Sequence, residues 1–167
     1  PLRAAEHAVA AAANASEALA FDHAARLYGF ALELHPSISN ADELRVQLAD
    51  ALTRAGRGFE AAPIYLSAAE TAKPDVALEL RRRAAENLLT GGHVERGLRV
   101  MEQVLASVGM EVPATPRRSL FRIIAERLRL ALRGSKYVEH TVADIPPELL
   151  LRVDVCWAVA TGLARRD

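Results

Sequence analysis

Residues 48–70, LADALTRAGRGFEAAPIYLSAAE, predict two helices joined by a glycine-containing turn at 56–58. In the second helix, Ala61, Tyr65 and Ala68 follow one another at i, i+4 and i+7, so they share one face. Small residues let two helix backbones approach closely, and the aromatic side chain fills the space between helix layers. We therefore expect a closely packed helix pair in which no residue carries out chemistry.

The small–large–small pattern occurs again on both sides of this stretch. Its other copies are Ala24, Tyr28 and Ala31, and Gly97, Met101 and Val104. The first members of successive copies are 37 and 36 residues apart, which is typical of a helical-repeat protein. Helices are predicted at 2–18, 21–34, 41–54, 58–72, 76–90 and 94–109, with Asp75 as the N-cap of the fifth. The predicted fold is all-α, with about eight helices: an α-solenoid of about three antiparallel helix hairpins in residues 1–110, stacked into a right-handed superhelix, then two C-terminal helices.

Residues 111–167 differ in character from the repeats. We expect a stiff linker at 111–116 and a basic helix at 117–133. An irregular crossing segment should follow at 134–145, and then the first helix of a truncated further repeat at 147–165. The last helix carries Cys156 beside Trp157 on an apolar stretch, so we expect a buried, inert thiol. All these segments are predicted to form one continuous helical domain with residues 1–110.

Composition narrows the class of protein. The chain has 167 residues and is 51% hydrophobic but only 5% aromatic, which favours a core of closely approaching helices. Lys plus Arg and Asp plus Glu both total 21, so no net charge attracts a polyanion. The lone cysteine suits a reducing cytoplasm, and no apolar run reaches the roughly 18 residues of a membrane span. Because Pro1 is not a natural start and the chain finishes abruptly at Asp167, we expect a piece of a longer protein.

Residues 5–109 resemble the tetratricopeptide-repeat family, because Ala24, Tyr28, Ala31 and Pro36 match the signature of its second helix. The chain also resembles the helical segment that follows the ATPase module in large bacterial serine/threonine kinases fused to signal-transduction ATPases of the STAND/AAA type. The phrases that carry this second resemblance are AFDHAARLYGFALEL, LRRRAAENLLTGGHVERGL, TPRRSL and ELLLRVDVCWAVATGLA. It implies a non-catalytic interaction or sensor scaffold of a signalling protein, without kinase or ATPase activity of its own.

By this resemblance, the first helix of each pair would line a concave binding surface. The candidate residues there are Glu43, Val46, Asp50, Arg54, Glu79, Arg82, Glu86 and Thr90. Four of the eight are carboxylates, which predicts a rather acidic groove. The expected occupant is a protein or peptide partner, or a neighbouring domain of the same chain. A small-molecule-sensing arm and a solvated surface without any ligand are the alternatives, and the sequence does not give the oligomeric state.

The predicted basic helix is a second candidate surface. Its candidate docking residues are Arg117, Arg118, Arg122, Arg129 and Arg133. We favour a solvated face, with docking on an acidic partner and binding to nucleic acid or an anionic surface as alternatives. Nucleic acid is disfavoured because the net charge is zero and aromatic residues do not alternate with the arginines.

No catalytic, metal-binding or cofactor-binding residue is predicted. The five histidines include no i, i+4 pair, and only one cysteine could join them in a zinc site. The glycines at 56, 58, 91 and 92 each lie at the turn of a predicted helix hairpin, so we interpret them as turn residues rather than as phosphate-binding loops.

Overall fold

The computed structural model describes residues 2–36, 40–110, 125, 127–132, 145–146, 149–150, 153–154 and 156–157. Within these ranges the chain is helical, with no strand. Its six helices are α1 (Leu2–Glu17), α2 (Phe21–Leu34), α3 (Ala41–Arg54), α4 (Gly58–Thr71), α5 (Pro74–Thr90) and α6 (Val94–Ser107). Residues 127–132 are helical as well. The first six predicted helices are therefore confirmed, with ends that differ by one or two residues.

One predicted helix start is wrong. The sequence places the start of the fifth helix at residue 76 behind an Asp75 cap, whereas α5 begins at Pro74 and has Lys73 as its N-cap. Proline suits the first helical position because its fixed φ is already helical and the N–H that it lacks would have no partner there. Asp75 lies instead in the first turn, where its carboxylate is favoured by the helix dipole.

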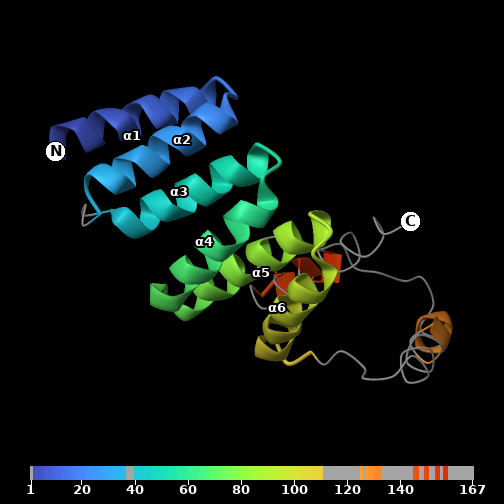
Figure 1. Cartoon of the computed structure of the whole chain (residues 1–167). Helices are drawn as coiled ribbons and strands as arrows, with labels where there is room; N and C mark the ends of the chain where they lie inside the picture. Colours follow the sequence, from blue (N-terminus) through green and yellow to red (C-terminus); the bar gives the residue numbers. More distant parts are fainter. Residues whose placement is uncertain are drawn as a thin grey trace.

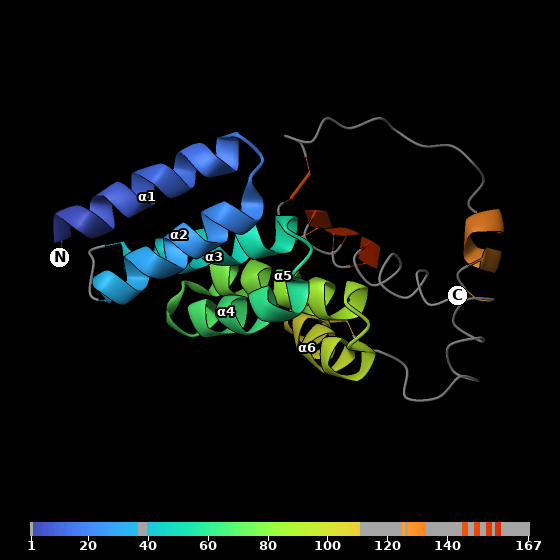
Figure 2. The ribbon, with the colours of Figure 1, turned by 45° about the horizontal axis from the view of Figure 1, so that its top comes forward.

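Each helix packs against the helices next to it along the chain. The helices α1 to α6 follow one another in order through the stack (Figure 1). The same succession is visible after the molecule is turned (Figure 2). The turns after α1, α3, α4 and α5 are short, so the helices that they join run in opposite directions.

The turns after α1, α3 and α5 share one backbone motif. In each turn, a residue with positive φ lies two positions before the next helix: Leu19 (59°), Gly56 (78°) and Gly92 (82°). The residue after it donates its N–H to a carbonyl five positions back at 2.8 Å in all three turns. This is the hydrogen bond of a Schellman motif, which ends a helix and satisfies its last carbonyl groups. Glycine adopts positive φ without strain, so the first turn is the unusual one.

The predicted small–large–small face is buried in all three copies. Ala24, Ala31 and Ala61 are completely buried, and the Tyr65 side chain is 1% exposed. Gly97 allows a close approach, because a Cβ atom placed there would lie 2.7 Å from Cγ of Leu89 on α5. The core is therefore built from helices that touch through alanine and glycine, as the composition predicts.

The C-terminal predictions fare less well where the structure describes them. Cys156 is exposed and Trp157 is 70% exposed, so the prediction of a buried thiol is wrong. Leu128, an apolar residue of the predicted basic helix, is 60% exposed. Helical periodicity identifies an apolar face but does not supply the helix that covers it, and among the described residues none buries these side chains. The predicted linker and crossing segment lie almost entirely outside the described residues.

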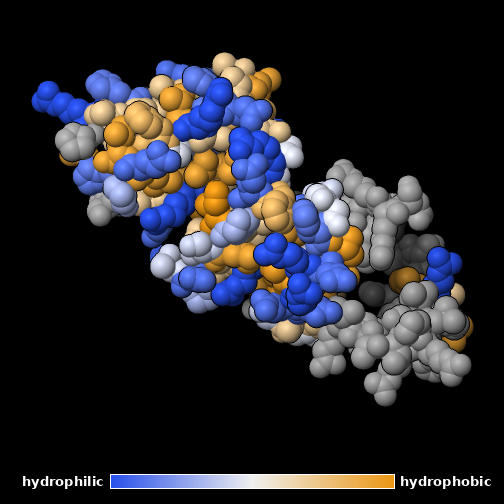
Figure 3. Space-filling model, in the orientation of Figure 1, coloured by the Kyte–Doolittle hydropathy of each residue, from blue (hydrophilic) through white to orange (hydrophobic). Residues whose placement is uncertain are grey.

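On the face seen in Figure 3, apolar areas are interspersed with hydrophilic side chains over the described helices. No helix in the described part of the chain is both long and apolar enough to cross a membrane.

Candidate functional site

A polar groove lies between α3 and α5, with one side chain contributed by α4. Its volume is about 450 Å³, and hydrogen-bonding side chains line most of it. The lining residues are Asp50, Thr53, Arg54, Tyr65, Arg82, Arg83, Glu86, Asn87 and Thr90. The Tyr65 ring is buried between the helices, whereas its hydroxyl reaches the groove.

Asp50 on α3 forms hydrogen bonds with side chains of two other helices, α4 and α5. Its Oδ1 atom accepts a hydrogen bond from the Tyr65 hydroxyl of α4 at 2.5 Å and another from Nη1 of Arg83 on α5 at 3.1 Å. The Thr53 hydroxyl lies 3.3 Å from the Tyr65 hydroxyl. Hydrogen bonds to a charged carboxylate are stronger than those between neutral groups, so these contacts fix the position of α3 relative to α4 and α5.

The α5 side of the groove carries an ion-pair network around Glu79. Arg82 binds this carboxylate through two nitrogens, Nε at 2.8 Å and Nη2 at 2.9 Å, and Arg83 donates to it from Nε at 2.8 Å. Nη1 of Arg82 also contacts Glu86 at 3.0 Å. The spacings i, i+3 and i, i+4 place these groups one turn apart on the helix surface. These ion pairs fix the orientation of the guanidinium groups of Arg82 and of Arg83.

Asn87 connects the groove to the start of α4. It is a buried polar side chain, and its Nδ2 donates to the Arg83 carbonyl at 2.9 Å. Gly58, the first residue of α4, lies so close that an added Cβ would come within 2.5 Å of Oδ1 of Asn87. A residue without a side chain is therefore required at this contact.

The pKa values of the site follow from burial and from these contacts. Burial, and then the hydrogen bond to Asp50, raise the pKa of Tyr65 to about 12. Burial would raise the pKa of Glu79, but the hydrogen bonds from Arg82 and Arg83 outweigh it and lower that pKa. Hydrogen bonds to Glu79 raise the pKa of both arginines. At neutral pH the phenol is therefore protonated and the Glu79 pairs are charged.

The structure brings most of the predicted concave-face residues together. Those lining the groove are Asp50, Arg54, Arg82, Glu86 and Thr90. Glu79 joins them through its ion pairs with Arg82 and Arg83. Glu43 is exposed away from the lining, and Val46 is half-buried against the core instead.

The prediction of an acidic groove is wrong. Its lining contains three arginines, Arg54, Arg82 and Arg83, against the carboxylates of Asp50 and Glu86. Arg54 lies over the Phe21 ring, 5.5 Å from its centroid, and makes no ion pair with any described residue. Arg83 was not among the predicted face residues, although its spacing of four residues from Glu79 could have identified it.

The second predicted surface is mostly beyond the described part of the chain. Arg117, Arg118, Arg122 and Arg133 lie outside it, whereas Arg129 is described and exposed. The basic docking face therefore stays a prediction.

Comparison of the chain with models of protein families, with curated proteins and with solved structures gives no match. In the part of the chain that the structure describes, no three His, Cys, Asp or Glu side chains are grouped so that they could hold a metal ion.

Proposed function

We propose that this chain is a non-catalytic scaffold that binds a peptide segment of a protein partner, or of a neighbouring domain, in the groove between α3 and α5. The observation that carries the proposal is the groove itself. Nine hydrogen-bonded or charged side chains from three helices converge on it, and the Asp50 and Glu79 contacts hold Tyr65, Arg82 and Arg83 in place. A surface whose donors and acceptors are already positioned loses little side-chain entropy when a ligand binds.

The proposal includes a tetratricopeptide-like α-solenoid built from the pairs α1–α2, α3–α4 and α5–α6. Three features support it: the repeated turn motif, its recurrence at intervals of 37 and 36 residues, and the buried small–large–small face. In such a stack the first helices of the pairs line one surface. The joint contribution of α3 and α5 to the groove agrees with that arrangement.

The chemistry of the groove favours an extended segment that carries a carboxylate. Arg54 is exposed and has no ion-pair partner among the described residues, so a ligand carboxylate can pair with its guanidinium. Thr53 and Thr90 offer hydroxyl groups on the α3 and α5 sides of the same groove. A peptide backbone that runs between the two helices can therefore be held at both edges.

The proposal is for binding rather than catalysis because the carboxylates are committed to structural contacts. Asp50 is held by Tyr65 and Arg83, and Glu79 is held by two arginines that lower its pKa. A general acid at neutral pH needs a pKa near 7, which requires the opposite shift. A role within a larger cytoplasmic signalling ATPase or kinase of a bacterium is supported by the sequence resemblance alone.

Peptide selection tests the proposal. A random peptide library is displayed against the chain, and the affinities of the enriched peptides are measured by fluorescence anisotropy. We expect enrichment of acidic peptides whose affinity falls about tenfold in Arg54→Glu, because attraction becomes repulsion. Arg26→Glu on α2 is the matched control, since Arg26 is also exposed and lies away from the groove. Equal losses in both variants, or no enrichment at all, would refute the proposal.

A small-molecule sensor is the second candidate, and the groove volume favours it. About 450 Å³ is within the range of pockets that bind small ligands, roughly 300–1,000 Å³. Such pockets are mostly apolar, however, whereas this groove is lined by charged and polar groups. Competition separates the two candidates, because a metabolite mixture would displace the selected peptides only if a small molecule occupies the same groove.

A further inference from the structure

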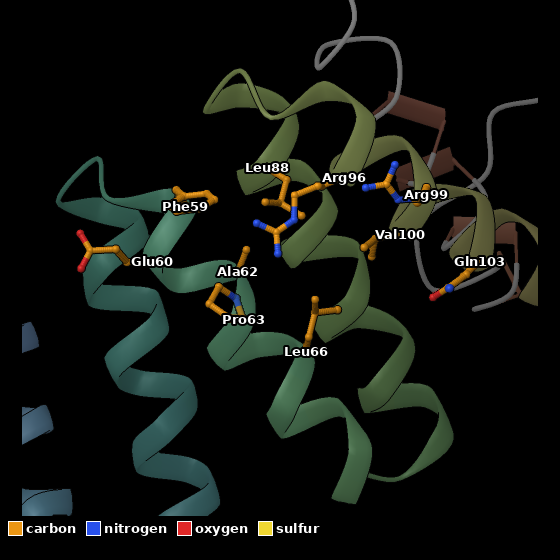
Figure 4. A pocket seen from close by; sticks show the side chains of 10 residues that line it. All are labelled: Phe59, Glu60, Ala62, Pro63, Leu66, Leu88, Arg96, Arg99, Val100 and Gln103. Atoms are coloured by element: carbon orange, nitrogen blue, oxygen red, sulfur yellow. The ribbon is translucent and has the colours of Figure 1, made fainter.

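A second groove lies between α4 and α6, with α5 contributing to its base. It has a volume of about 640 Å³ and shares no lining residue with the groove between α3 and α5. Its lining residues are Phe59, Glu60, Ala62, Pro63, Leu66, Leu88, Arg96, Arg99, Val100 and Gln103. Figure 4 shows these side chains on the helices that surround the groove. The sequence does not predict this groove because its two helices belong to different predicted pairs.

The base of this groove is apolar. Ala62, Pro63 and Leu66 come from two neighbouring turns of α4, and Val100 faces them from α6. Leu66 and Val100 are half-buried against the core, so part of each side chain is left for a ligand to cover. Pro63 has no N–H to donate to the Phe59 carbonyl, which leaves this acceptor at the groove without its usual partner within the helix.

The rim is positively charged. Arg96 and Arg99 are exposed on α6, and neither forms an ion pair with a described residue. The one carboxylate in the lining, Glu60, is already bound at both oxygens by Arg57, at 2.8 Å and 2.7 Å. The groove therefore presents two unpaired guanidinium groups beside an aliphatic surface.

The aromatic contacts argue against a nucleic acid as the occupant. Phe59 is the only aromatic residue in the lining. Its ring is stacked on His93, with centroids 4.0 Å apart, and the Arg96 guanidinium lies 5.8 Å from the same ring. Binding of single-stranded nucleic acid depends on aromatic faces on which bases can stack, and here the only ring is already in use.

We propose that the groove between α4 and α6 is a second docking site, which binds an acidic amphipathic segment of a protein partner. An aliphatic side chain of the partner covers Leu66 and Val100, while its carboxylates pair with Arg96 and Arg99. Arginine favours such pairing because its planar group can donate two hydrogen bonds to one carboxylate. This site is independent of the function proposed for the groove between α3 and α5, since the two have no residue in common.

A designed peptide pair tests this site. The probe is a labelled synthetic helix with leucines at i, i+3, i+4 and i+7 and glutamates elsewhere, and its partner has glutamine in place of every glutamate. Binding to the full chain is measured by fluorescence anisotropy. We expect saturable binding of the acidic peptide that weakens with salt, and at least about tenfold weaker binding of the glutamine peptide.

Charge reversal at the rim locates the binding. Arg96→Glu with Arg99→Glu should lower the affinity for the acidic peptide at least about tenfold. The control is Arg3→Glu with Arg26→Glu, which changes the net charge equally at exposed positions of α1 and α2 and should stay within about twofold of the parent. Leu66→Ala should also weaken binding, because it removes part of the apolar base. Circular dichroism melts confirm that each variant is folded.

Three results would overturn the proposal: equal loss of affinity in the control pair, equal binding of the glutamine peptide, or no saturable binding. A fourth is tighter binding of a short single-stranded oligonucleotide to the same two arginines, which would make the site a nucleic-acid surface.

Discussion

The Tyr65 hydroxyl donates a hydrogen bond to Oδ1 of Asp50 at 2.5 Å, which joins α4 to α3 at the edge of the polar groove. Arg83 of α5 donates to the same oxygen. The ring of Tyr65 thus packs in the core while its hydroxyl organises the site, so one side chain links the stability of the helix stack to the shape of the groove.

Tyr65→Phe should therefore destabilise the chain while leaving the core filled. We expect a loss of about 1–2 kcal/mol in the free energy of unfolding, because the lost bond has a charged acceptor. The control is Tyr28→Phe at the equivalent buried position of α2, where the hydroxyl makes no hydrogen bond with a described residue. Its effect should stay within about 0.5 kcal/mol. Urea unfolding measures both, and equal effects would contradict the role given to the hydroxyl.

The same contact predicts a loss of stability at alkaline pH. The pKa of Tyr65 is raised from its ordinary value of 10.0 to about 12 in the folded chain. Between these values the unfolded state has released the proton and the folded state still holds it, so stability is full below pH 10 and falls as pH rises through 12. Tyr65→Phe should remove this component. The free energy of unfolding is measured for the parent chain and for Tyr65→Phe over this pH range. An equal loss of stability in both chains would contradict the prediction.

Leu19→Gly should stabilise the chain. Leu19 adopts a φ of 59° where the two other turns have glycine, and its side chain is 72% exposed. Relief of the left-handed conformation outweighs the greater entropy of an unfolded glycine, for a net gain of about 0.5–1 kcal/mol. Gly56→Ala is the reverse test, because no atom lies within 4 Å of the added Cβ and only the φ of 78° opposes it. Thermal melts that moved both variants in the same direction would contradict the shared turn motif.

Gly97→Ala should destabilise the contact between α5 and α6. The added Cβ would lie 2.7 Å from Cγ and 3.0 Å from the backbone nitrogen of the buried Leu89, which cannot move away freely. We expect a cost of about 1–3 kcal/mol. Gly29→Ala in the middle of α2 meets no atom within 4 Å and should stabilise the chain by about 0.5–1 kcal/mol. Urea unfolding compares the two, and a neutral Gly97→Ala would mean that α5 and α6 are less tightly packed.

The sequence was informative about helices because proline and glycine mark their ends. Period and residue size also predicted the buried face with Ala61 and Tyr65. The target of the Tyr65 hydroxyl could not be predicted, because periodicity assigns a side chain to a face but not to a partner on another helix. Arg81, Arg82 and Arg83 are consecutive on α5. Spacing along the helix pairs Arg82 and Arg83 with Glu79, but only tertiary packing decides that Arg83 also reaches Asp50 on α3.

The groove between α4 and α6 was beyond prediction for a related reason. Its residues are spread over three helices, and no spacing within a single helix distinguishes Arg96 and Arg99 from other exposed arginines. The error at Cys156 has the same origin, since an apolar helical face does not reveal whether another helix covers it.

The most direct test of the central claim maps a selected peptide onto the chain by NMR. The peptide is selected for binding to the Arg96→Glu, Arg99→Glu variant, so that the groove between α4 and α6 cannot contribute to its selection. It is then titrated into the isotope-labelled chain. We predict saturable shifts of the backbone amide signals of Thr53 on α3 and of Asn87 and Thr90 on α5, and loss of these shifts in Arg54→Glu. Saturable binding that leaves these three signals unchanged would show that the groove between α3 and α5 is not the peptide-binding surface.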